Sequence, residues 1–90
     1  MLVTENGIAD AKDRWRPDFL RASLAALDRV RGDGIDVRGY FHWSLMDNFE
    51  CMDGLHGRFG LFATDFDRPG APRLARGSSR AYAAEVKRRR

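Results

Sequence analysis

The sequence has few residues that can bind metals or form cross-links. Among its 90 residues are one cysteine, Cys51, and two histidines. A single cysteine cannot form a disulfide within the chain, so a reducing compartment, the cytoplasm, is the expected location. One Cys and two His are too few for a zinc-type centre, and we expect neither a metal nor a cofactor.

Long hydrophobic runs are also absent. No apolar stretch approaches the ~18 residues that a membrane-spanning helix needs, so the sequence predicts no membrane contact. Hydrophobic residues still make up 43% of the chain, which is enough for a core and argues against disorder. Ninety residues form one small domain at most, whereas a complete (β/α)₈ barrel needs about 250.

The basic character of the chain is concentrated at one end. The formal net charge is +3, but residues 87–90 are Lys-Arg-Arg-Arg, and without these four it falls to −1. A terminal basic run is typical of a solvated tail. A nucleic-acid footprint would instead spread basic residues over one face with aromatics between them, so we expect no nucleic-acid partner.

The first two elements are predicted as a strand and a helix. Residues 2–5 favour a strand, and Asn6-Gly7 is a turn signal that ends it. After a polar loop over residues 8–16, Pro17 suits the first turn of a helix. That helix ends near Gly32 and Gly34. Its apolar residues recur at helical spacing on one face: Leu20, Leu24, Leu27 and Val30.

A second strand and helix follow. Residues 37–43 are mostly apolar on both faces, as in a buried parallel strand. A long loop over about residues 44–72 contains a short extended piece at 59–66. The last helix is predicted to be capped by Ser78 or Ser79 and to run to about Lys87, with Tyr82 and Val86 on its inner face. A strand, a crossover helix and a second strand predict a parallel, right-handed βαβ unit and an α/β fold.

Glu5 is the candidate catalytic residue. It lies in Val-Thr-Glu-Asn-Gly, where a strand meets a turn, and α/β barrels carry their chemistry at such strand ends. Taken alone, a Glu before Asn-Gly is an ordinary turn acid. The motif, however, closely resembles the nucleophile motif of glycoside hydrolase family 1, the β-glucosidase and β-galactosidase family. This resemblance implies that Glu5 is the nucleophile of a retaining glycosidase.

A second stretch, residues 39–50, carries the resemblance further. The family has a Trp beneath the sugar, a Glu seven residues later that binds sugar hydroxyls, and a Phe nine residues beyond; Trp43, Glu50 and Phe59 have those spacings. Indole rings stack on sugar C–H faces, and carboxylates accept strong hydrogen bonds from hydroxyls. Without the resemblance, Trp43 would be interpreted as a core aromatic, Glu50 as a solvated loop acid and Phe59 as part of a packing strand.

The position after Glu50 departs from the family, which has Trp where this chain has Cys51. A thiol is a weak donor, so this substrate-binding position predicts altered sugar selectivity, unless it reflects a one-base change in a Trp codon. The family branch acting on 6-phosphorylated sugars has Ser in place of Glu50. A carboxylate there would repel a phosphate, so the resemblance implies a β-glycoside of an unphosphorylated sugar.

The resemblance implies that residues 1–90 are a partial family domain, the last two βα units of a (β/α)₈ barrel. None of the three glutamates, Glu5, Glu50 and Glu85, lies in the Asn-Glu-Pro setting of the family's acid/base. We interpret Glu85 as an exposed helix residue. The chain alone is therefore expected to be inactive and to need the N-terminal part of the barrel as its partner. Two alternatives remain open: a non-catalytic sugar-binding or regulatory piece, and a basic-tailed interaction domain unrelated to sugars.

Overall fold

The computed structural model describes residues 1–49, 54 and 56–89. The elements follow in the order β1 (Leu2–Asn6), α1 (Arg16–Gly32), β2 (Gly39–His42), β3 (Phe62–Thr64), β4 (Arg73–Ala75) and α2 (Gly77–Arg88). The molecule is elongated, with extents of 48 × 27 × 20 Å. Neither helix in the described ranges combines the length and apolar character needed to cross a bilayer.

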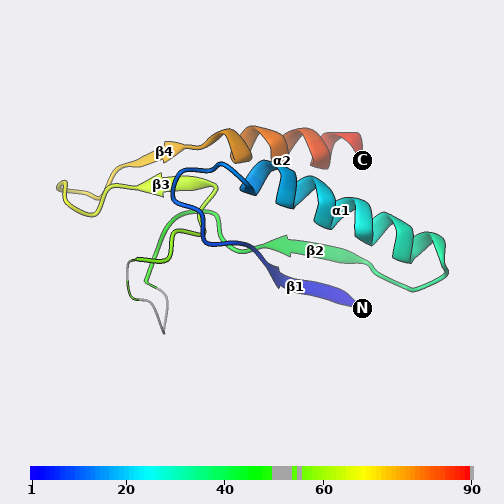
Figure 1. Ribbon diagram of the computed structural model, residues 1–90. Coiled ribbons are helices and arrows are strands. Elements are labelled where there is room, and N and C mark those ends of the chain that lie inside the picture. The colour runs from blue at the N-terminus through cyan, green and yellow to red at the C-terminus, as the bar shows by residue number, and fades with distance from the viewer. Residues whose placement is uncertain (50–53, 55, 90) are drawn as a thin grey trace.

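Strands β1 and β2 pair in parallel, as predicted. Leu2 is opposite Gly39 and Asn6 is opposite His42, with an irregularity in the register between Val3 and Asn6. The helix α1 makes the crossover between them. Figure 1 shows α1 and α2 side by side above this two-stranded sheet, with no helix of the described chain below it.

Helix α1 forms largely as its spacing predicts. Leu20 and Leu24 are buried, while Leu27 and Val30, further along the same face, are half-buried. The helix includes Arg16, which was predicted to end the preceding loop and is fully buried. A long charged side chain reaches the core here because its guanidinium finds hydrogen-bond partners inside.

Strand β4 was not predicted. It pairs antiparallel with β3, with Phe62 opposite Ala75 and Thr64 opposite Arg73. Its three residues are all exposed, so they carry no alternating apolar pattern that would reveal a strand. The short extended piece expected at residues 59–66 is confirmed as β3.

Helix α2 begins and packs differently from the prediction. Its N-cap is Arg76, and no side chain of the helix caps it, so the predicted Ser78 or Ser79 cap is wrong. The Ser79 hydroxyl instead donates to the Arg76 carbonyl at 2.7 Å. The carboxylate of Asp13 takes the capping role from outside the helix by accepting the Ser78 N–H at 2.7 Å.

The inner face of α2 is also different. Its buried residues are Ser78, Ala81 and Glu85, while Val86 is exposed and Tyr82 half-buried. The small side chains of Ser78 and Ala81 allow α2 to lie against α1. The interpretation of Glu85 as exposed is therefore wrong.

The basic C-terminus forms ion pairs and continues α2. Lys87 and Arg88 belong to α2, and Arg90 lies outside the described residues. Arg89 donates to Asp28 of α1 at 2.7 Å and to Glu85 at 2.6 Å. These ion pairs join the ends of the two helices, which differs from the solvated tail that the sequence predicts.

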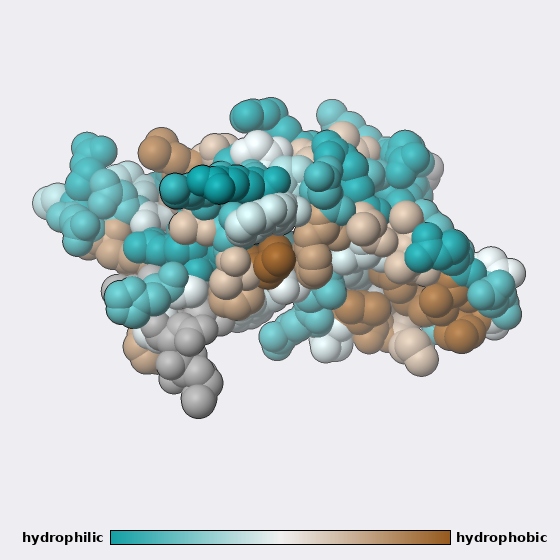
Figure 2. Space-filling view, viewed as in Figure 1, coloured by the Kyte–Doolittle hydropathy of each residue, from teal (hydrophilic) through white to brown (hydrophobic). Residues whose placement is uncertain are grey.

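The open side of the β1–β2 sheet carries exposed apolar side chains. Figure 2 shows hydrophobic residues gathered at the end of the molecule where these strands begin. Large hydrophobic residues exposed in and around the two strands are Met1, Leu2, Ile35, Phe41 and Trp43.

Candidate active site

The ends of β1 and β2 bring the two best candidates from the sequence together. Glu5 is the next-to-last residue of β1, and Trp43 directly follows β2. The backbone N–H of Trp43 donates to the carbonyl of Asn6 at 2.9 Å. Because the strands are parallel, both side chains lie at the carboxyl end of the sheet.

Side chains of β2 alternate between the helices and the open side. Tyr40 and His42 lie near Tyr82 of α2, with ring centroids 6.4 and 6.0 Å away. Burial lowers the pKa of His42. The alternation of a strand then places Phe41 and Trp43 on the opposite, open side, where they are 58% and 37% exposed.

A side-chain hydrogen bond on the helix-facing side of the sheet fixes the end of β1. The Tyr40 hydroxyl donates to Oδ1 of Asn6, the residue after Glu5, at 2.8 Å. Burial raises the pKa of Tyr40 to about 12, with a smaller contribution from the nearby Tyr82. This hydroxyl therefore keeps its proton at neutral pH. The backbone next to Glu5 is thereby tied to β2.

The Glu5 carboxylate itself is exposed and has no hydrogen bond or ion pair within the described part of the chain. The segment that follows it packs tightly on the neighbouring strand end at Gly7. A Cβ at Gly7 would lie 1.8 Å from the carbonyl oxygen of Trp43, so only glycine fits. The Trp43–Ser44 peptide bond is cis. Because the Glu5 carboxylate is exposed, it is available to a ligand at the open end of the sheet.

Phe59 reaches the same end from the long loop. The N–H of Ser44 donates to the Phe59 carbonyl at 3.1 Å, and the N–H of Leu61 donates back to the Ser44 carbonyl at 2.9 Å. These bonds place Phe59 beside the residue that follows Trp43. The structure therefore brings together three of the predicted site residues: Glu5, Trp43 and Phe59.

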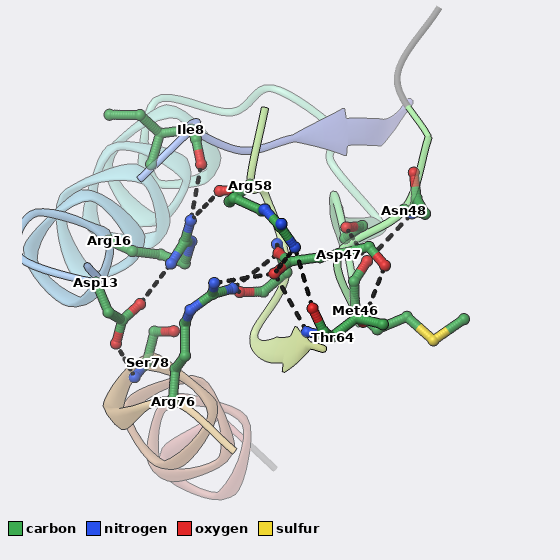
Figure 3. A network of polar contacts seen from close by, with 12 residues as sticks. Ile8, Asp13, Arg16, Met46, Asp47, Asn48, Arg58, Thr64, Arg76 and Ser78 are labelled. Atoms are coloured by element: carbon green, nitrogen blue, oxygen red, sulfur yellow. Dashed lines mark hydrogen bonds and ion pairs between the residues drawn. The ribbon is translucent and has the colours of Figure 1, made fainter. Parts of the chain in front are cut away.

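A buried acid that is hydrogen-bonded to the residue after Phe59 was missed by the sequence analysis. Asp47 is 2% exposed. Its Oδ1 accepts the Gly60 N–H at 3.0 Å and Nη1 of Arg76 at 2.8 Å; its Oδ2 accepts Nη2 of Arg76 at 2.9 Å, the Thr64 N–H at 3.3 Å and Nη1 of Arg58 at 3.4 Å (Figure 3). Burial raises the pKa of Asp47, but the Arg76 guanidinium and the two backbone N–H groups outweigh it and hold the pKa below its usual value.

A second buried network, also missed, supports the loop after Glu5. The Arg16 guanidinium donates to the carbonyls of Ile8 and Arg58 at 3.1 and 2.6 Å and pairs with Asp13 (Figure 3). Asp10 accepts the backbone N–H of Arg16 at 3.0 Å and so caps α1. Arg16 and Arg58 are 42 residues apart, and no local sequence pattern shows such a pair.

Other candidates lie elsewhere or outside the described residues. Glu50 and Cys51 are among the residues that the structure does not describe. Glu85 lies near the C-terminal end of α2, where hydrogen bonds from Arg89 and Arg88 lower its pKa. Within the described ranges, no cluster of His, Cys, Asp or Glu could hold a metal ion.

The chain matches known proteins along its whole length. The family model for glycosyl hydrolase family 1 covers residues 1–90. The β-galactosidase of Saccharolobus solfataricus is 49% identical over 67 residues, which are 74% of this chain and 14% of that protein. Human lactase/phlorizin hydrolase is 44% identical over 85 residues, which are 89% of this chain and 4% of that protein.

Solved structures agree with the sequence relatives. A hyperthermophilic β-glucosidase from Pyrococcus furiosus superposes with a TM-score of 0.92 at 43% identity, covering 98% of this chain and 18% of that one. The psychrophilic β-glucosidase BglU from Micrococcus antarcticus gives a TM-score of 0.86 at 37% identity, covering 99% of this chain and 20% of that one. The chain thus spans a fifth or less of these relatives, and it belongs to glycosyl hydrolase family 1.

Proposed function

We propose that the 90 residues are the C-terminal part of a retaining β-glycosidase, the last two βα units of its barrel. Glu5 is the nucleophile, and Trp43, Glu50 and Phe59 contact the sugar. The observation that carries the proposal is the parallel pairing of β1 and β2, because it sets Glu5 and Trp43 side by side at one end of the sheet. Barrel enzymes build their active sites at that end.

In this reaction Glu5 attacks the anomeric carbon and forms a glycosyl-enzyme intermediate, which water then hydrolyses. An exposed carboxylate without a protein partner suits that role, since no ion pair must be broken when substrate binds. Tyr40 supports it from behind by fixing the neighbouring Asn6. The close approach of Gly7 to the Trp43 carbonyl limits the movement of the strand end.

The second carboxyl group of the reaction must come from outside this chain. A retaining site needs a proton donor about 5–5.5 Å from the nucleophile. Glu85 does not fit, because it lies at the far end of α2 and its two arginine partners hold it ionised. The isolated chain is therefore inactive, and the preceding barrel units supply the acid/base.

The substrate is a β-glycoside of an unphosphorylated sugar. Relatives named β-galactosidase and β-glucosidase support glucosides and galactosides as the class. Trp43 offers its exposed ring to the C–H face of the sugar, and the backbone of Phe59 pairs with Ser44, the residue after Trp43. Glu50 accepts hydrogen bonds from the outer hydroxyls, and Cys51 adjusts the selectivity.

A chimera tests this proposal. The 90 residues replace the matching C-terminal part of the Pyrococcus furiosus β-glucosidase, and hydrolysis of an aryl β-glucoside is measured. Glu5→Gly should abolish turnover, and azide or formate should restore it, because a small anion can enter the space left by the carboxylate. Glu50→Ala should lower kcat/KM by about 10- to 100-fold, as expected for a lost charged hydrogen bond, without such rescue. If azide rescues the Glu50 variant and not the Glu5 variant, the roles are reversed.

The 90-residue chain alone provides a second test. It should not hydrolyse the aryl glucoside, since proton donation is worth about 10²–10⁴-fold and its source is absent. Saturable hydrolysis that Glu5→Ala abolishes would contradict the proposed division of the site. Saturable sugar binding without hydrolysis, in both the chain and the chimera, would favour a non-catalytic sugar-binding piece.

A further inference from the structure

The long loop after Trp43 is closed at its base by two backbone segments. Residues 44–47 and 59–64, here called the clasp, run against each other. The Phe62 N–H donates to the Leu45 carbonyl at 2.8 Å, and the Asp47 N–H donates to the Phe62 carbonyl at 3.1 Å. Together with the two Ser44 bonds, these set the position of Phe59 relative to Trp43, although 16 residues separate them.

The segments of the clasp lie too close for a side chain at Gly60. A Cβ there would be 2.4 Å from the Asp47 nitrogen and 2.6 Å from the Met46 carbonyl carbon. The Asp47 carboxylate can therefore reach the Gly60 and Thr64 N–H groups from the opposing segment. Its two oxygens also receive both branches of the Arg76 guanidinium, from the residue that begins α2.

We propose that Asp47 is a positioning residue for sugar recognition: it holds the clasp in register and so sets Phe59 against Trp43. The inference rests on the proposed function of Trp43 and Phe59. A carboxylate suits this task because each of its oxygens accepts from one clasp N–H and one branch of the Arg76 guanidinium, and Oδ2 also accepts from Arg58. Asparagine would turn an NH₂ group toward one of these donors and lose that side of the arrangement.

A buried ion pair can also be merely structural, so the experiment must separate position from stability. In Asp47→Asn, the Arg76 guanidinium keeps its charge with its carboxylate partner gone. The double variant Asp47→Asn/Arg76→Gln removes that charge but does not restore the acceptor for both clasp N–H groups. Arg76→Gln alone is the control for the Arg76 bond to the Gly60 carbonyl at 2.7 Å, which the double variant also loses. If Asp47 positions the clasp, the double variant recovers thermal stability while sugar recognition stays impaired.

The variants are made in the chimera with the Pyrococcus furiosus barrel units and assayed with an aryl β-glucoside. Asp47→Asn should raise KM about tenfold or more, as expected from a lost charge-assisted hydrogen bond, with a smaller change in kcat. The double variant should keep the raised KM although its Tm returns toward that of the parent. The matched control is Asp36→Asn, an exposed acid paired with Arg38, whose KM should stay within about twofold.

Two results overturn the inference. One is an unchanged KM in Asp47→Asn; the other is a KM that recovers together with Tm in the double variant, which would make the role of Asp47 structural only. A parent chimera without any hydrolysis contradicts the proposed function instead. Asp47 is then judged by amide hydrogen exchange in the 90-residue chain. The Gly60 and Thr64 amides should exchange about tenfold faster in Asp47→Asn than in Asp36→Asn, and equal rates would refute the inference.

Discussion

Replacing Arg16 by Met should destabilise the fold strongly, because this arginine joins three parts of the chain. Its side chain is fully buried and bonds the loop after β1 at Ile8, the long loop at Arg58, and Asp13, which in turn caps α2. Methionine can fill much of the same volume but donates no hydrogen bond. The change therefore isolates the polar contribution.

The magnitude follows from the groups left behind. The Ile8 carbonyl loses its donor at about 1–3 kcal/mol, the Arg58 carbonyl loses one donor but keeps the Asp10 N–H, and the Asp13 carboxylate loses its cation. Not having to bury a guanidinium offsets part of this cost, which leaves a net loss of about 3 kcal/mol. A chain of this length has a free energy of unfolding of about 5–13 kcal/mol, so the variant should still fold.

The assay is urea unfolding of the 90-residue chain, followed by helical circular dichroism. With a urea dependence of about 2 kcal/mol per molar, the midpoint should fall by about 1.5 M. Arg21→Met is the matched control, because Arg21 lies on the same helix and pairs with an aspartate at the same spacing but is 54% exposed. It should cost about 0.5 kcal/mol or less. Equal midpoints for the two variants would refute the role given to Arg16.

The remaining predictions concern the clasp and the strand end. The pKa of Asp47 is lower in the folded chain than in the unfolded one. The ionised Asp47 therefore contributes its full stabilisation above the unfolded pKa of about 3.9, and this contribution is lost as pH falls through the folded pKa. Asp47→Asn should make the fall of Tm in acid less steep, and an unchanged slope would contradict this. Gly60→Ala should lower the free energy of unfolding by more than about 2 kcal/mol in the same urea assay, because its Cβ meets backbone atoms. Gly32→Ala, whose Cβ would have no atom within 4 Å, should be neutral or stabilising. Equal effects of the two variants would argue against the tight clasp. Tyr40→Phe should lower the free energy of unfolding by about 1 kcal/mol because it loses the hydrogen bond to Asn6. Tyr82→Phe should cost less, since the Tyr82 hydroxyl has no hydrogen bond within the described chain. The reverse order would count against a supporting role of the Tyr40–Asn6 bond.

The backbone plan could be predicted where local pattern and geometry agree. The spacing of Leu20 and Leu24 predicts the face of α1, and the length of the crossover predicts a parallel pair, which the register confirms. The Asn-Gly turn signal predicts that the strand ends near Glu5, and the observed β1 ends one residue later, at Asn6. These features depend on neighbours in sequence, so one sequence is enough to show them.

The inner face of α2 could not be predicted in this way. Tyr82 and Val86 are its larger apolar residues, but Ser78 and Ala81 are buried instead because small side chains let two helices lie close. Glu85 is buried because Arg88 and Arg89 cover it with ion pairs. Apolar spacing says nothing about such coverage by charged neighbours.

The buried polar residues that support the site could not be predicted from the sequence, for a related reason. Asp47 is bonded to Gly60, Thr64 and Arg76, which are 13, 17 and 29 residues away. In sequence it is one aspartate in an acid- and aromatic-rich loop, with the appearance of a solvated residue. The resemblance to the family's motifs pointed to the candidate ligand-contacting residues, Glu5, Trp43 and Phe59, but not to the groups that hold them in place.

The open side of β2 links the stability of the chain to its proposed activity. Phe41 and Trp43 share that side, and Phe41 is the more exposed of the two. In a parallel barrel, inward residues deeper in a strand fill the core, while those at its carboxyl end line the active site. In the barrel that we propose, the strands that bury Phe41 are also those that bring the proton donor toward Glu5. Stability and hydrolysis should therefore be gained together when the preceding barrel units are joined to this chain.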